Sequence, residues 1–162
     1  MNIPSIVLRL EYEAPEAMIP GAIIFGGVAQ IPSWSKVLEE YPNFVKTQNP
    51  EQRIQVTEAF NPLNCSVLKV SHHGSKHGTV LECAEVLNPE YALVSCSGSS
   101  AYGFPHEIAL LSLKEETDRM YFTDYSVAGK ARSGTTVVVS PGTEPPGVVS
   151  IGEERGAMAS PP

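Results

Sequence analysis

Short apolar runs alternate with helix-like segments after residue 64, and this alternation constrains the fold more than any other feature of the sequence. Residues 66–71 (SVLKVS), 91–96 (YALVSC) and 119–123 (RMYFT) have the length and the β-branched or aromatic content of strands. Residues 79–87 and 105–117 lie between these runs and predict helices. Strands that alternate with helices indicate an α/β fold in which sheet and helices form layers.

The first part of the chain predicts two more strands with no helix between them. Residues 21–27 (GAIIFGG) form a continuous apolar run, which indicates a strand buried on both faces. Residues 5–12 (SIVLRLEY) alternate as a half-buried strand does, with one apolar and one charged face: Ile6, Leu8, Leu10 and Tyr12 against Arg9 and Glu11. A strand pair without an intervening helix predicts a mixed sheet.

The remaining segments complete one expected domain. A helix is expected from Ser33 to Tyr41, with Ser33 as its N-cap and Trp34, Val37 and Leu38 on its apolar face. Residues 42–64 are polar and punctuated by prolines, which favours a long loop with one short helix at most. A last strand is expected at 135–140. We therefore assign residues 1–140 to one domain and the Pro-, Gly- and Glu-rich residues 141–162 to a disordered tail.

Composition excludes several classes of protein. A chain of 162 residues, of which 42% are apolar, suits one soluble domain. Its apolar stretches are shorter than the roughly 20 residues that span a bilayer, and no signal peptide is visible, so we expect a cytoplasmic protein without a membrane segment. The net charge of −7 argues against a broad nucleic-acid surface, but it allows a small local phosphate site. Cys65, Cys83 and Cys96 lack C-x-x-C spacing and are expected to be reduced and mostly buried.

All four histidines lie between residues 72 and 106. His72 and His73 follow the strand predicted at 66–71, and strand ends are a common place for ligands in α/β proteins. Neighbouring side chains on an extended backbone point to opposite faces, so we expect one ring to bind a metal and the other to support it or pack. A polar surface turn is the alternative from spacing alone. His77, in the loop that follows, is interpreted as a solvated side chain.

The run AYGFPHEIALLSLKEE predicts the start of a helix beside the fourth histidine. Pro105 suits the first helical turn, and it pushes the preceding Phe104 out of helical space. His106 would then lie in the first turn, near free backbone N–H groups that attract phosphate. This histidine is either a functional residue or the cap of its own helix.

These pieces occur together, in this order, in a known family. VLKVSHHGSKHGT, LNPEYALVSCS, YGFPHE and YFTDY, preceded by NIPSIVLRLEY and IIFGGVAQIPSW, resemble the soluble hydrolase domain of ComEC-type competence (DNA-uptake) proteins. That family has the αββα metallo-β-lactamase fold. The resemblance implies that this chain forms the C-terminal half of the sandwich, a mixed sheet with helices on one face.

The resemblance also implies a chemistry. Its members use a dinuclear centre, usually zinc or manganese, whose hydroxide would here attack phosphorus in a phosphodiester of nucleic acid or a nucleotide. Carried onto this sequence, His72 or His73 matches a metal ligand, and His106 matches a catalytic histidine near the substrate phosphate or the metal. The neighbouring polar residues would bind the substrate phosphate or support the ligands: Ser71, Ser75 and Lys76.

The chain departs from the family pattern in two places. No histidine precedes residue 72, so the early H-x-H/D-x-D-H motif and a further histidine are absent. Relatives have GD or GGD where this chain has Gly26-Gly27-Val28, and that aspartate bridges the two metals. Val28 offers no lone pair and Gln30 is a weak substitute, so no dinuclear centre is expected at full strength. A sheet without the earlier half of the sandwich would also expose apolar strand faces.

Two hypotheses stay open on the sequence. In the first, the chain is the C-terminal part of a metal-dependent phosphodiester hydrolase, completed by an N-terminal half in upstream sequence or on another protein chain. In the second, it is a degenerate, non-catalytic module that binds a protein partner or nucleic acid. The chain by itself is expected to be inactive.

Overall fold

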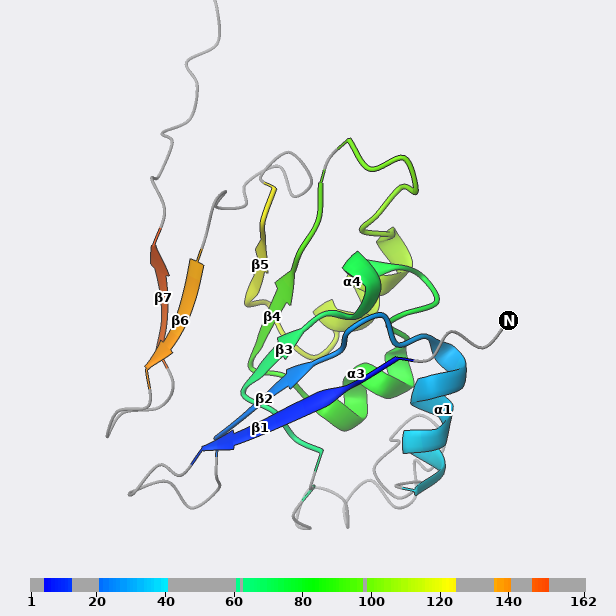
Figure 1. The fold of residues 1–162 in the computed structure, drawn as a ribbon, viewed down its shortest axis with the longest axis horizontal. Coiled ribbons are helices and arrows are strands. Elements are labelled where there is room, and N and C mark those ends of the chain that lie inside the picture. The colour runs from blue at the N-terminus through cyan, green and yellow to red at the C-terminus, as the bar shows by residue number, and fades with distance from the viewer. Residues whose placement is uncertain are drawn as a thin grey trace, which may run out of the picture.

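The computed structural model describes residues 5–12, 21–40, 61, 63–97, 99–124, 136–140 and 147–151. The chain forms a five-stranded sheet in the order β1-β2-β3-β4-β5 (Figure 1). Its strands are β1 (Leu8–Tyr12), β2 (Gly21–Phe25), β3 (Val67–Lys69), β4 (Tyr91–Val94) and β5 (Met120–Phe122). β1 is antiparallel to β2, whereas β2, β3, β4 and β5 run parallel. The predicted α/β fold with a mixed sheet is confirmed.

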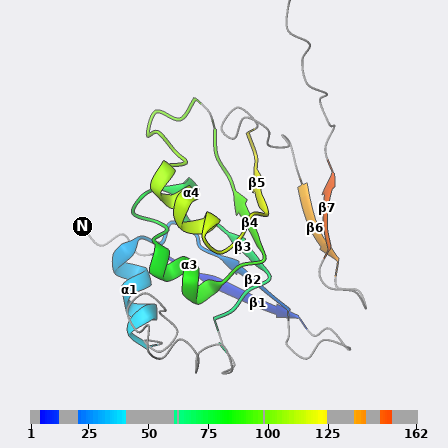
Figure 2. The same ribbon diagram turned by 180° about the vertical axis from the view of Figure 1, so that it is seen from behind.

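In the described part of the chain, the α-helices cover one face of this sheet (Figures 1 and 2). They are α1 (Ile31–Glu40), α3 (Leu81–Leu87) and α4 (Glu107–Lys114). α3 joins β3 to β4 and α4 joins β4 to β5, which is how parallel strands are commonly connected. One cluster of buried side chains joins the helices to the sheet. Ile24, Leu68 and Ala92 pair in register and therefore lie on the same face of the sheet. They pack with helix residues in this cluster: Trp34, Ala84, Leu87 and Leu113. The helices therefore lie on one face, as predicted.

The opposite face of β1 and β2 exposes apolar side chains. Leu8 and Leu10 are 56% and 51% exposed, and Phe25, which pairs with Leu8, is 41% exposed. Arg9 points to the helix side, where its Nη1 donates to the carbonyl of Asn64 at 2.7 Å. The alternation predicted for β1 is present, but its apolar side faces away from the core. The prediction that 21–27 is buried on both faces is wrong at Phe25, because the three helices cover the other side of the sheet.

The start of α1 differs from the sequence prediction. The helix begins at Ile31, and the carbonyl of Gln30 accepts a hydrogen bond from the Trp34 N–H at 3.1 Å. Ser33 therefore lies inside the helix and is not its N-cap. Pro32 fits the first turn because no intrahelical partner is needed for its missing N–H. The Trp34 ring is buried, as predicted, and its Nε1 donates to the carbonyl of Gly78 at 2.8 Å.

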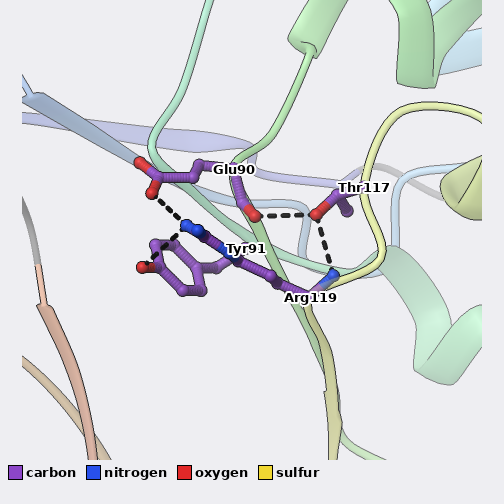
Figure 3. A network of polar contacts seen from close by, with 4 residues as sticks. All are labelled: Glu90, Tyr91, Thr117 and Arg119. Carbon is purple, nitrogen blue, oxygen red and sulfur yellow. Dashed lines mark hydrogen bonds and ion pairs between the residues drawn. The ribbon is translucent and has the colours of Figure 1, made fainter.

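A polar network connects the beginnings of β4 and β5 (Figure 3). The hydroxyl of Thr117 donates to the carbonyl of Glu90 at 2.7 Å and accepts from the backbone N–H of Arg119 at 3.0 Å. The guanidinium of Arg119 pairs with the Glu90 carboxylate and lies 5.1 Å from the centre of the Tyr91 ring. The network thus holds the edge strand β5 in register beside β4.

A second sheet contains β6 (Thr136–Ser140) and β7 (Gly147–Ile151), which pair antiparallel. β6 matches the strand predicted at 135–140. β7 falls within residues 141–162, where no strand was predicted. The rest of that range lies outside the described residues, as does most of the loop predicted at 42–64. No helix in the described part of the chain is long and apolar enough to cross a membrane.

Candidate functional site: a histidine cleft at the strand ends

The histidine pair lies in a tight turn directly after β3. Residues Ser71–Gly74 form a short 3-10 element in which His72 and His73 have φ values of 45° and 58°, and Gly74 has 77°. Left-handed backbone is uncommon for residues other than glycine and persists where surrounding contacts hold it. The expectation of extended backbone at this pair is therefore wrong. Both rings face the same cleft, with 6.3 Å between their centres.

Contacts with the turn after β2 hold the histidine turn in place. The His72 N–H donates to the carbonyl of Gly27 at 2.9 Å, and the buried Ser71 hydroxyl donates to the carbonyl of Gly26 at 3.1 Å. A Cβ at Gly26 would lie only 2.3 Å from the Ser71 oxygen, so this approach requires glycine. Ser71 thus joins the two strand ends, and its role beside metal ligands or a substrate phosphate stays a prediction.

The loop before α4 packs against the same turn from the other side. The backbone N–H of His106 donates to the carbonyl of Gly74 at 2.8 Å. A Cβ at Gly74 would approach the Pro105 side chain to 2.7 Å. Two segments that are distant in sequence therefore fix the position of the histidine pair.

Hydrogen bonds orient the two imidazoles differently. The Nδ1 of His73 lies 2.8 Å from the carbonyl oxygen of Ser95, which can only accept, so in the neutral ring Nδ1 carries the proton and Nε2 has the lone pair. The Nδ1 of His72 lies 3.0 Å from the amide nitrogen of Gln30, which can only donate. In the neutral ring, His72 therefore carries its proton on Nε2. Of the pair, His73 is the ring with a lone pair to offer at Nε2.

The cleft has a volume of about 650 Å³ and is lined by three segments. The ends of β2 and β3 contribute Val28, His72 and His73; the segment after β4 contributes residues 95–97; and the loop before α4 contributes residues 100–102 and 104. Val28 is 42% exposed. The position that the family resemblance assigns to a bridging aspartate thus opens into the same cleft as both histidines.

The described residues do not form a metal site by themselves. They contain no group of three or more His, Cys, Asp or Glu side chains that could hold an ion. A zinc site needs three protein ligands when catalytic and four when structural, and the valine at residue 28 supplies none. The zinc or manganese centre expected from the resemblance does not fit these residues without further ligands.

The structure separates the other predicted site residues from the cleft lining. Ser75 is buried, and its hydroxyl accepts from the backbone N–H of His77 at 3.3 Å. Lys76 and His77 are exposed, which agrees with the interpretation of His77 as a solvated side chain. None of these three residues lines the cleft. The substrate-binding roles of Ser75 and Lys76 stay predictions.

His106 is the N-cap of α4, the alternative that the sequence left open. Its Nδ1 accepts from the Ile108 N–H at 3.3 Å, and the helix begins at Glu107. Pro105 lies before the cap, following a cis peptide bond with Phe104, and not in the first helical turn. His106 is outside the residues that line the cleft, and its catalytic role stays a prediction.

Sequence reasoning missed the loop residues that complete the cleft. Tyr102 and Phe104 line it, yet no role was predicted for them beyond the effect of Pro105 on the backbone of Phe104. The available signal was the pair of aromatic residues within SCSGSSAYGF, a Ser- and Gly-rich run with little apolar sequence to pack against.

The cysteines agree with the prediction of mostly buried thiols, because Cys65 and Cys83 are buried and Cys96 is half-buried at the cleft.

The fold and the cleft define an α/β domain with histidines at the carboxyl ends of parallel strands. Among curated proteins, the chain is similar to ComE operon protein 3 of Bacillus subtilis (strain 168), with 34% identity over 91 residues. The matched segment covers 54% of this chain and 12% of that protein, so the chain spans a small part of its relative. No family model matches the sequence, and no solved structure matches it significantly. The similarity supports the relation to ComE proteins, whereas the metallo-β-lactamase fold stays a prediction.

Proposed function

We propose that this chain is the C-terminal part of a metal-dependent hydrolase of the metallo-β-lactamase fold. With an N-terminal half, it would cleave phosphodiester bonds of nucleic acid or nucleotides in a cytoplasmic competence (DNA-uptake) context. The observation that carries the proposal is the orientation of His73, whose Nδ1–H donates to the Ser95 carbonyl while its Nε2 lone pair is free. Metal-binding histidines are commonly oriented by this kind of contact on the second ring nitrogen.

The two histidines take different roles in this proposal. His73 is the metal ligand, and His72, held by Gln30, supports the turn and the cleft wall. Because the described residues lack a group of ligands sufficient for a metal ion, the remaining ligands come from the N-terminal half. The similarity to ComE operon protein 3, a much longer chain, supports the view that related sequences work within larger proteins.

The exposed apolar face of β1 and β2 is the surface on which the N-terminal half would pack. Leu8, Leu10 and Phe25 lie together on this face and are each at least 41% exposed. Contiguous exposed apolar surface favours association, because its burial removes it from water. A partner at this face would lie next to β2, whose end leads into the cleft at Val28.

Val28 provides the experiment that tests the proposed function. The chain is combined with the segment of ComE operon protein 3 that precedes the matched 91 residues, and with manganese or zinc. Val28→Asp should then raise metal affinity and switch on cleavage of single-stranded DNA, because a carboxylate joins His73 in the cleft. In the isolated chain the same change should alter the unfolding free energy by only about 1 kcal/mol or less, since residue 28 is partly exposed.

Val28→Asn is the matched control, because asparagine resembles aspartate in size and polarity but carries no charge. It should bind metal much more weakly than Val28→Asp. If Val28→Asp behaves like the parent chain in metal binding and cleavage within a complex that forms, the hydrolase proposal is wrong for this chain.

The second candidate function is a non-catalytic module that binds a protein partner or nucleic acid. It is favoured by the apolar Val28 side chain at the position expected to bridge two metals. A stable complex with the N-terminal segment that stays inactive with Val28→Asp would support this alternative.

A further inference from the structure

The cleft contains an aromatic ladder that metal binding does not explain. Tyr102 is 82% exposed, and its ring stacks on Phe104 with 5.8 Å between centres and 24° between planes. Phe104 in turn meets the edge of His72, with 5.2 Å between centres and 63° between planes. We call these three residues, Tyr102, Phe104 and His72, the aromatic ladder. It extends from the surface to the histidine turn.

The loop that carries the ladder is held by its own hydrogen bonds. The Ser100 hydroxyl accepts from the N–H groups of Tyr102 and Phe104 at 3.3 and 3.4 Å. The Gly103 N–H donates to the Ser100 carbonyl at 3.1 Å, and Gly103 has a φ of 67°, which glycine adopts without strain. Because the loop is organised in this way, Tyr102 presents its ring with little ordering cost when a ligand binds.

The polarity of the cleft narrows the class of ligand. The described residues that line the cleft include no Asp, Glu, Lys or Arg, although the chain has 18 acidic and 11 basic residues. A cation over the ring would have no carboxylate from the lining, and a phosphate would have no ammonium or guanidinium. The polar lining consists of the two imidazoles, the serine hydroxyls and the Cys96 thiol. A ligand with a flat, neutral ring and polar edges suits this cleft, because its face can stack on Tyr102 and its edges can form hydrogen bonds with the hydroxyl groups.

We propose that Tyr102 is a stacking platform for a nucleobase, so that the cleft takes unpaired nucleic acid or a nucleotide by its base. The choice of a nucleic-acid ligand rests on the proposed function. Stacking on aromatic side chains is sequence-tolerant, because every base has a π face. In a duplex the bases are stacked on their neighbours, so the platform selects single strands.

Binding without metal or turnover tests the platform directly. The isolated full chain is titrated with a fluorescein-labelled single-stranded thymidine oligonucleotide, with an abasic strand of equal length, and with a duplex, all followed by fluorescence anisotropy. The thymidine strand should bind about 5- to 100-fold more tightly than the abasic strand. Tyr102→Ala should remove this difference, and Tyr102→Phe should keep it. Leu111→Ala is the matched control, because Leu111 is 54% exposed on α4 outside the cleft.

Two further measurements separate the sources of affinity. Thymidine monophosphate and deoxyribose 5-phosphate, compared by NMR titration, show whether a free nucleotide is bound through its base. A shallow salt dependence is expected for oligonucleotide binding, because none of the described lining residues is basic and could displace counterions.

The proposed stacking role of Tyr102 would be wrong under any of three results. These are equal binding of the thymidine and abasic strands, unchanged binding by Tyr102→Ala, and no binding of any strand. None of these results bears on hydrolysis by the completed site, which the Val28→Asp experiment tests. Conversely, base binding that depends on Tyr102 would stand even if the completed protein cleaved no phosphodiester.

Discussion

At the scale of single residues, the most informative feature is the backbone of His72 and His73. Two consecutive non-glycine residues with positive φ cost on the order of 1–3 kcal/mol each, so the contacts around them must hold the turn. Those contacts also set which nitrogen of each ring carries a proton. The turn therefore presents two chemically different imidazoles to one cleft.

The first prediction concerns these protonation sites. In the neutral rings, His73 should be protonated at Nδ1 and His72 at Nε2, because Ser95 offers an acceptor and Gln30 a donor. Long-range ¹H–¹⁵N NMR correlations distinguish the two forms. Gln30→Ala should allow His72 to populate both forms and leave His73 unchanged as an internal control. A His73 ring with its proton on Nε2 would contradict the assignment of its free lone pair.

A second prediction at this scale concerns pH. Burial raises the pKa of the Cys65 thiol from 9.0 to about 12, and it raises the pKa of Cys83 as well. At a pH between the ordinary thiol pKa and the raised one, a thiol loses its proton in the unfolded chain but keeps it in the folded chain. Each of the two thiols should therefore lower the unfolding free energy by up to about 1.4 kcal/mol for every pH unit of increase.

Denaturant unfolding between about pH 8 and pH 11 measures this slope. The double variant Cys65→Ala and Cys83→Ala should show a shallower decline. The same slope in the parent and the double variant would show that other groups cause the alkaline loss of stability.

At the scale of elements, helices and strands were found where sequence periodicity predicted them, but most were shorter. β3, β4 and β5 lie within the predicted runs and are shorter than them. An apolar run can extend past the last residue that pairs with a neighbouring strand, so the run overestimates the length of the strand. The ends depend on contacts that the sequence does not reveal. α1 starts at Ile31 because the carbonyls of Gln30 and His77 accept its first N–H groups.

The third prediction uses the network between β4 and β5 (Figure 3). Thr117→Val should reduce the unfolding free energy by about 1–3 kcal/mol, because the buried hydroxyl satisfies the backbone of both Glu90 and Arg119. Arg119→Ala should cost about 1 kcal/mol or less, since its ion pair with Glu90 is substantially exposed. Chemical denaturation of the two variants compares them, and a larger loss for Arg119→Ala would contradict this ranking.

At the scale of the whole molecule, the described part of the chain has helices on one side of its sheet and exposed apolar side chains on β1 and β2 at the other. The cleft has one well-oriented candidate ligand in His73, but the described residues include no group of three or more side chains that could hold a metal ion. Both features are consistent with the proposal that a further segment completes the site.

The fourth prediction is that the isolated chain neither holds metals tightly nor hydrolyses phosphodiesters. One or two histidines do not complete a zinc site, so elemental analysis after dialysis should find well under about one zinc per chain. Single-stranded DNA and model diesters should stay intact with added manganese or zinc. Two firmly held metals, or an activity that His72→Ala with His73→Ala removes, would show that the chain already contains a sufficient ligand set.

The sequence by itself determined the α/β layering, the mixed sheet and the place of the histidine pair at a strand end, because these depend on local periodicity and chain order. The resemblance to ComEC-type proteins also implied that Val28 lies beside the histidines. Only the tertiary structure decided which side of β1 faces the core, that His72 and His73 share one cleft, and that Tyr102 completes it. These properties depend on hydrogen bonds between segments far apart in sequence, such as His73 to Ser95 and His72 to Gln30, and no local pattern encodes such partners.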